Sequence, residues 1–283
     1  MTFANNPEPA DYRPFEEWPT FGALANGFDD FLPPSTSKLV GLTFDHKFEN
    51  GWRLRHDFTQ DKVQWQMLEG ERAGTSGYAE YKAYEFRPDM FMVDFFKEDH
   101  EQLVTLILNT ATGQLKACIS GWVDKNGERR TWTTFMNAVS VIGVAGDEKS
   151  VTSYNHTAEL VGKHCLYRYS ERNAYEHFYV NPRTFAWHCL AGTQKNLADA
   201  EQCDTFKLGE NLYLFFWTET LLPVESIIVI DLEKLRSIGR FLCWDPKPQA
   251  KVHVRFASEA TILNQVNLAA ELEKPLKDTW GAL

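Results

Sequence analysis

The chain has 283 residues, with 29 Lys and Arg against 39 Asp and Glu, and a formal net charge of −10 at pH 7. This acidic balance argues against a nucleic-acid-binding protein, because phosphate binding needs clustered Lys and Arg. The apolar share of 43% and the aromatic share of 14% are typical of a globular protein rich in aromatic side chains.

The first 35 residues contain Pro, Asn and Asp without a regular hydrophobic period, which predicts an irregular arm. They show neither the basic region nor the apolar core of a signal peptide. No apolar run in the chain is long enough to span a membrane. The five cysteines are scattered and have no C-x-x-C spacing, so we expect free thiols, a cytoplasmic protein and no metal site.

The chain contains an internal duplication. Three landmarks recur at almost one spacing, and the repeating unit has the size of a domain. The matches are LVG at 39–41 with 160–162 (121 residues), WQMLEG from Trp65 with WHCLAG from Trp187 (122 residues), and ISGW ending at Trp122 with FLCW ending at Trp244 (122 residues).

Both halves alternate polar and apolar residues with the period of β-strands. Strand-like runs arrive about every 8–12 residues and are separated by turn signals such as Asn126-Gly127, which is typical of closed antiparallel barrels or sandwiches. The clearest runs are 52–58, 62–67, 90–96 and 102–108 in the first half, and 212–217, 225–230 and 250–256 in the second.

The predicted fold is therefore all-β, with two antiparallel barrels in tandem. The polar segment 143–157 is the expected linker. We expect an arm at 1–35, a first barrel at 36–146, a second barrel at 158–265 and a short helix near the C-terminus, before Pro275. A small barrel of this kind can hold one small ligand, but the fold alone does not distinguish a binding protein from an enzyme.

The second half resembles the phenolic acid decarboxylases, which are small lipocalin-like (calycin) barrels. The resemblance rests on the order of Tyr167-x-Tyr169, Tyr175-Glu176, TFAWHCLAG at 184–192 and FWTET at 216–220. The whole chain, with two such barrels in tandem, is similar to the MoaF family, whose second barrel carries YEH, W-x-x-x-x-G and W-x-E landmarks.

This resemblance implies roles for individual residues. Tyr167 and Tyr169 stand where the decarboxylases hold the substrate carboxylate, and Glu219 stands where their proton-handling acid lies. His188 replaces an arginine of that family, and it could serve as an anchor or as a second acid or base. The expected substrate-binding side chains are Tyr175, His177, Trp187 and Trp217.

The alternation leaves the direction of these side chains open. His188 lies on the face opposite Phe185, Trp187 and Cys189, and both faces carry side chains that can be buried. The tyrosines could equally be ordinary packing residues with hydroxyls at the rim. Glu219 could be a solvated residue at a strand end or a buried acid with a raised pKa.

The first half lacks most of these polar residues. Its counterpart of the tyrosine pair is Phe44-x-His46, and the places of His188 and Glu219 are occupied by Gln66 and Lys97. We therefore expect the main site in the second barrel, with the first as scaffold or a degenerate second pocket. The run 53–57 is interpreted as a solvated strand, and Asp94 as a candidate lining residue of the first barrel.

Two functions are compatible with the sequence. One is a cofactor-free lyase or related proton-transfer enzyme (a decarboxylase, hydratase or isomerase) acting on a small phenolic or aromatic-amine-derived substrate. The other is a non-catalytic binding protein for a small hydrophobic or aromatic ligand. The MoaF name is linked to molybdenum-cofactor synthesis and monoamine metabolism, but the sequence has no glycine-rich loop or basic cleft for a pterin phosphate. Apolar outer faces would also allow a homodimer.

Overall fold

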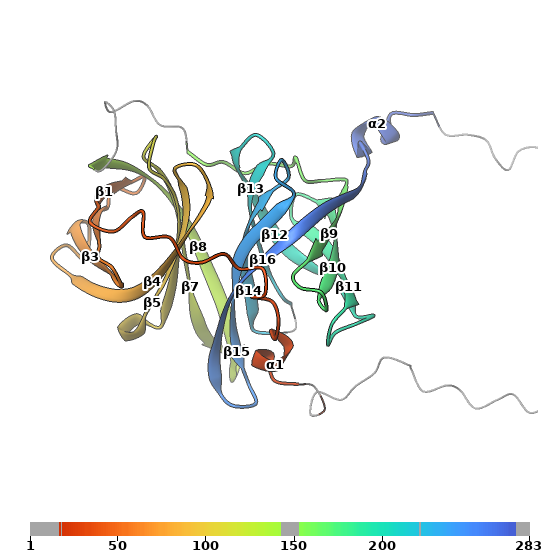
Figure 1. The fold of residues 1–283 in the computed structure, drawn as a ribbon, viewed down its shortest axis with the longest axis horizontal. Helices are drawn as coiled ribbons and strands as arrows, with labels where there is room; N and C mark the ends of the chain where they lie inside the picture. Colours follow the sequence, from red (N-terminus) through yellow and green to blue (C-terminus); the bar gives the residue numbers. More distant parts are fainter. Residues whose placement is uncertain (1–16, 18, 143–152, 221, 276–283) are drawn as a thin grey trace, which may run out of the picture.

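The computed structural model describes residues 17, 19–142, 153–220 and 222–275, and in this part of the chain it contains two closed antiparallel barrels in tandem (Figure 1). The first consists of β1 (Thr43–Phe48), β2 (Arg53–Phe58), β3 (Lys62–Glu69), β4 (Ser76–Arg87), β5 (Met90–Lys97), β6 (Gln102–Asn109), β7 (Gln114–Lys125) and β8 (Glu128–Ile142). The second consists of β9 (Lys163–Arg168), β10 (Ala174–Asn181), β11 (Thr184–Ala191), β12 (Ala198–Gly209), β13 (Leu212–Thr218), β14 (Val224–Asp231), β15 (Arg236–Asp245) and β16 (Ala250–Gln265). The predicted fold class is confirmed.

Each barrel is an up-and-down meander in which neighbouring strands are neighbours in sequence, and the last strand pairs with the first. The hairpin between β7 and β8 shows how the sequence fixes the register. Asn126 and Gly127 both have positive φ (55° and 81°), the conformation that two-residue hairpin turns require. Closure leaves no free sheet edge, so register and side-chain direction are fixed together.

The helices are short. The arm contains α1 (Phe21–Leu24), a 3-10 turn η2 (Glu98–His100) joins β5 to β6, and α2 (Leu268–Leu272) follows the second barrel. The weak helical spacing near the C-terminus begins while the chain is still strand, because β16 continues to Gln265. No helix in the described ranges is long and apolar enough to cross a membrane.

The arm closes one end of the second barrel. The backbone N–H of Phe21 donates to Asp245 Oδ2 at 2.7 Å, and Asn173 Nδ2 donates to the carbonyl of Asn26 at 2.9 Å. Phe28 enters the barrel core and is only 6% exposed, with its ring centroid 4.7 Å from that of Tyr169. Burial of this aromatic side chain anchors the arm at the end where the β9–β10 and β15–β16 loops lie.

The two barrels pack against each other through outward-facing apolar side chains of β4–β7 and β12–β16. A polar cluster lies in this interface. Arg240, which is fully buried, pairs with Glu225 and also donates to Thr105 Oγ1 at 3.0 Å and Ser120 Oγ at 2.9 Å of the first barrel. A guanidinium group needs such partners when it is removed from water.

Asp94 also belongs to the interface and does not line the first barrel, so that interpretation was wrong. Its carboxylate lies 2.7 Å from Arg255 Nε and 2.7 Å from His253 Nε2, both on β16. The neighbours Val93 and Phe95 face the interior of the first barrel, and the strand period therefore sends Asp94 outward.

We predict that Arg240→Met lowers the free energy of unfolding by about 3–5 kcal/mol, because it leaves the Glu225 carboxylate buried without its partner. The measurement is urea unfolding at constant pH. Lys274→Met, which breaks an exposed pair with Glu271, is the control and should leave stability nearly unchanged. Adding Glu225→Leu to Arg240→Met should restore part of the loss. A loss no larger than that of the control would contradict the role given to this pair.

Candidate functional site

The interior of the second barrel contains most of the predicted site residues. Tyr167, Tyr169 and Tyr175 face inward and are at most 8% exposed. The hydroxyl groups of Tyr167 and Tyr179 are hydrogen bonded at 2.8 Å, and Tyr175 Oη donates to Gln194 Oε1 at 2.9 Å. Two of the three tyrosine hydroxyls thus already have protein partners. Tyr179 was not among the predicted site residues, although it shares the strand face of Tyr175.

His177, Trp187 and Trp217 lie on the same inner surface. The His177 ring is 4.7 Å from Tyr167 and 5.9 Å from Trp217, centroid to centroid, and Trp187 is 6.1 Å from Tyr175. Burial lowers the pKa of His177 to about 3, so its imidazole is neutral at physiological pH. His177 Nδ1 has no hydrogen-bond partner in the described part of the chain.

Glu219 lies on the inner face just beyond the end of β13, continuing the alternation of Tyr213, Phe215 and Trp217. The residue keeps some contact with solvent, but its carboxyl group is surrounded by protein. Burial raises its pKa to about 8, and repulsion from Glu201 and Asp199 acts in the same direction. The barrel mouth therefore holds a carboxylic acid that is largely protonated near neutral pH.

His188 is on the outside of the second barrel. Its Nδ1 lies 3.8 Å from Glu176 Oε1, and the same carboxylate contacts His164 Nε2 at 2.8 Å. The apolar trio Phe185, Trp187 and Cys189 faces inward, so the strand period places His188 at the surface. This position contradicts a role for His188 beside Tyr167 and Glu219.

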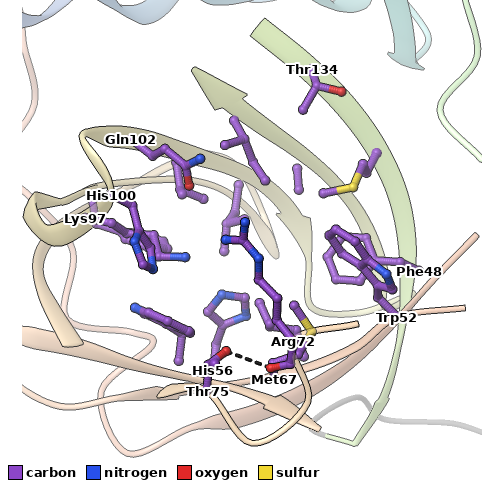
Figure 2. Close-up of a pocket in the computed structure, with 18 of the residues that line it drawn as sticks. Phe48, Trp52, His56, Met67, Arg72, Thr75, Lys97, His100, Gln102 and Thr134 are labelled. Carbon is purple, nitrogen blue, oxygen red and sulfur yellow. Dashed lines mark hydrogen bonds between the residues drawn. The ribbon is translucent and has the colours of Figure 1, made fainter. Parts of the chain in front are cut away.

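The first barrel contains a cavity of about 390 Å³ (Figure 2). It opens at the end formed by the β1–β2, β3–β4 and β5–β6 loops, and its lining combines aromatic, sulfur-containing and basic side chains. The lining residues are Phe48, Trp52, Leu54, His56, Trp65, Met67, Glu71, Arg72, Thr75, Phe95, Lys97, His100, Gln102, Val104, Leu106, Ala117, Ile119, Trp132, Thr134 and Met136.

The duplication explains this space. At some equivalent inward positions the second barrel carries the larger side chain: Trp217 corresponds to Phe95, 122 residues earlier, and Phe241 corresponds to Ile119. The second barrel also receives Phe28 from the arm. Since an eight-stranded barrel is just wide enough to be filled by its own side chains, smaller residues leave room for a ligand.

Lys97 lies at the mouth of this cavity, at the place that Glu219 occupies in the second barrel. Its Nζ is 3.7 Å from the centroid of the Trp65 ring. Burial, together with the nearby positive charge of Arg72, lowers the pKa of Lys97 to about 8. At equivalent positions, the mouth of the first barrel thus carries a basic group and the mouth of the second carries an acidic group.

His56 is the deepest residue that β2 contributes to the cavity, and the expectation of a solvated strand at 53–57 was wrong for its side chain. It is 1% exposed, its Nδ1 has no hydrogen-bond partner among the described residues, and its pKa is lowered mainly by burial. It is the counterpart of His177, 121 residues later. The alternation with Leu54 and Phe58 was the signal that could have identified it.

Two family models and one curated relative match this chain, and all three point to the same family. Residues 16–124 match the MoaF N-terminal domain, and residues 154–266 match the MoaF C-terminal domain. The chain belongs to the MoaF family. Protein MoaF of Klebsiella aerogenes is 30% identical over 173 residues, which cover 58% of this chain and 66% of the relative, slightly less than two thirds of its length.

One solved structure is also similar to part of this MoaF-family chain. It is described only as a candidate beta-lactamase from Burkholderia vietnamiensis, with 15% identity, 37% of this chain and 95% of that chain covered, and a TM-score of 0.31. That TM-score is too low to support an inference.

In the described ranges of this MoaF-family chain, no group of three or more His, Cys, Asp or Glu side chains is placed to bind a metal ion, and the five cysteines are buried and free. The interiors of both barrels carry aromatic walls with a few titrating side chains.

We predict that Glu219→Gln changes the pH dependence of stability. Between the ordinary glutamate pKa of 4.5 and the folded value of about 8, the folded protein holds a proton that the unfolded chain releases. Glu219 therefore lowers stability as pH rises through this window, and removing it should stabilise the protein more at pH 9 than at pH 5. Urea unfolding at both pH values measures the difference. Glu80→Gln, on the exposed face of β4, is the control, and an equal effect of Glu219→Gln at both pH values would contradict the assignment.

Proposed function

We propose that this MoaF-family protein binds a small aromatic ligand inside the first barrel, without a cofactor. The observation that supports the proposal is the cavity of about 390 Å³, a size within the usual range for small-molecule sites. The alternative binding function considered from the sequence is thus retained, but in the barrel where no main site was expected.

The walls of the cavity suit a flat ring. Trp52, Trp65 and Trp132 provide aromatic surfaces, and Met67 and Met136 provide flexible, polarizable contacts that adapt to ligand shape. The interior is lined mainly by carbon, so burial of an aromatic ring would supply most of the binding free energy.

We predict that Ala117→Leu removes ligand binding and leaves the fold intact, because the added carbon atoms occupy the cavity. The matched control is Ala260→Leu, which places the same group in the filled second barrel and should cost about 1–3 kcal/mol in stability through overpacking. Urea unfolding measures stability for both variants.

Binding is measured with cinnamate, cinnamamide and cinnamylamine by calorimetry and by the NMR signals of the methionine methyl groups. Met67 and Met136 line the cavity, whereas Met90 and Met92 lie in the interface between the barrels. A ligand in the first barrel should shift the first pair and spare the second. Absence of binding by all three compounds would contradict the proposal, and so would shifts confined to Met90 and Met92.

A second candidate function is proton transfer to a small phenolic or aromatic-amine-derived substrate in the second barrel. The observation that favours it is Glu219, an inward carboxylic acid with a pKa of about 8 beside the tyrosine-lined interior. Such an acid can donate a proton to an unsaturated side chain near neutral pH. Phe28 would have to move to admit the substrate.

This candidate is tested by turnover of 4-hydroxycinnamate and related aromatic amine derivatives. Glu219→Gln should reduce the rate by about 100-fold or more, because it removes the transferable proton. Ala117→Leu is the control, since it blocks the other barrel and should leave the rate unchanged. No turnover by the unmodified protein across the panel would contradict the enzymatic function.

A further inference from the structure

The first-barrel cavity has basic side chains at its mouth, which would favour a ligand with a negative charge. We infer that the ligand is an aromatic carboxylate whose anionic group lies between Lys97 and Arg72 at the cavity mouth. This inference rests on the proposed binding function and adds the chemical class of the ligand.

Among the residues that the structure describes, neither Lys97 nor Arg72 has a carboxylate partner. No ion pair in the described part of the chain includes either side chain, although the Arg72 charge acts on Lys97. Figure 2 shows the Arg72 side chain extending into the cavity, with Lys97 and His100 at its side. Two positive groups facing the same space repel each other, and a bound anion would relieve that repulsion.

Arg72 differs in this respect from the arginines that pair with buried carboxylates. Arg55 pairs with Asp45, Arg87 with Asp231, and Arg255 with Asp94. The loop that carries Arg72 is tied to β3 by two backbone hydrogen bonds, from Gly74 N–H to the Met67 carbonyl at 2.9 Å and from Met67 N–H to the Thr75 carbonyl at 2.8 Å. An arginine on such a loop, extending into an aromatic cavity, is placed to bind a carboxylate.

The acidic content of the cavity is small. Glu71 is the one acidic residue among the lining residues that the structure describes, and both Glu71 and its neighbour Arg72 are exposed at the mouth. Lys97 and Arg72 outnumber Glu71 two to one around the cavity, even though the whole protein has a net charge of −10. The excess of positive charge is therefore confined to the mouth of the first-barrel cavity.

His56 provides an independent observation within the cavity, at the β2 position that follows Leu54 on the inner face. Its Nδ1 is buried and has no hydrogen-bond partner among the described residues, and its side chain lines the cavity. A buried polar atom without a partner is costly unless a ligand or water satisfies it. The site is therefore built for a ligand with an apolar ring and polar atoms, and not for a pure hydrocarbon.

The protonation of Lys97 makes binding depend on pH. The amine has a pKa of about 8 in the free protein. A carboxylate beside it favours the charged form, so the protein takes up a proton when the ligand binds. Affinity should be highest below pH 8 and fall as the pH rises through 8.

The test compares cinnamate, cinnamamide and cinnamylamine, which share one ring and differ in charge. By calorimetry, cinnamate should bind at least about tenfold more tightly than cinnamamide, which is the worth of a hydrogen bond to a charged group. The preference should disappear in Lys97→Met combined with Arg72→Ala. Lys62→Met is the matched control, because Lys62 also lies over an aromatic ring, that of Tyr78, but outside the barrel.

The pH arm uses cinnamate between pH 6.5 and 9.5. The unmodified protein should lose affinity several-fold above pH 8, whereas Lys97→Met should show no such loss. Equal or tighter binding of the amide or the amine would overturn the inference and leave the proposed binding function standing. Failure of all three probes to bind would overturn both.

Discussion

Closure of each sheet into a barrel is the constraint on which the rest of this structure depends. A closed barrel has no free edge, so every strand has one register, and each side chain points either inward or outward. This assignment places Glu219, Tyr175 and His177 inside the second barrel and His188 outside it. The same assignment directs the Arg240 side chain outward, so that it contacts the first barrel and does not enter the interior of the second.

The duplication then shows how one fold supports two different interiors. The second barrel is filled by aromatic side chains that pack edge to face, with ring centroids of Phe185 and Phe215 5.0 Å apart. At several of these positions the first barrel has Val, Leu or Ile instead of an aromatic side chain, and it contains a cavity. The barrels are joined by an apolar interface with the buried Arg240–Glu225 pair, so the filled barrel can stabilise the open one.

The sequence was sufficient to predict the fold because the relevant signals are local. Strand alternation, turn residues and a repeat at 121–122 residues determine two barrels without knowledge of their packing. The site was less predictable because both faces of many strands are buried. Leu214 and Ile227 face outward yet lie in the barrel–barrel interface, so burial did not identify the inner face. The cavity depends on the summed volume of side chains from all strands, which no single motif records.

The two barrel mouths place opposite demands on a ligand. Burial drives both Glu219 and Lys97 toward their neutral forms, one pKa rising and the other falling to about 8. Near Lys97 a carboxylate ligand restores the charged state and is attracted, whereas near Glu219 it meets two further carboxyl groups, Glu201 and Asp199, and is repelled. The decarboxylase resemblance implies a carboxylate in the second barrel, but the charges of this chain favour a carboxylate in the first. The two barrels thus share one strand arrangement, while equivalent positions at their mouths carry a basic group in the first barrel and an acidic group in the second.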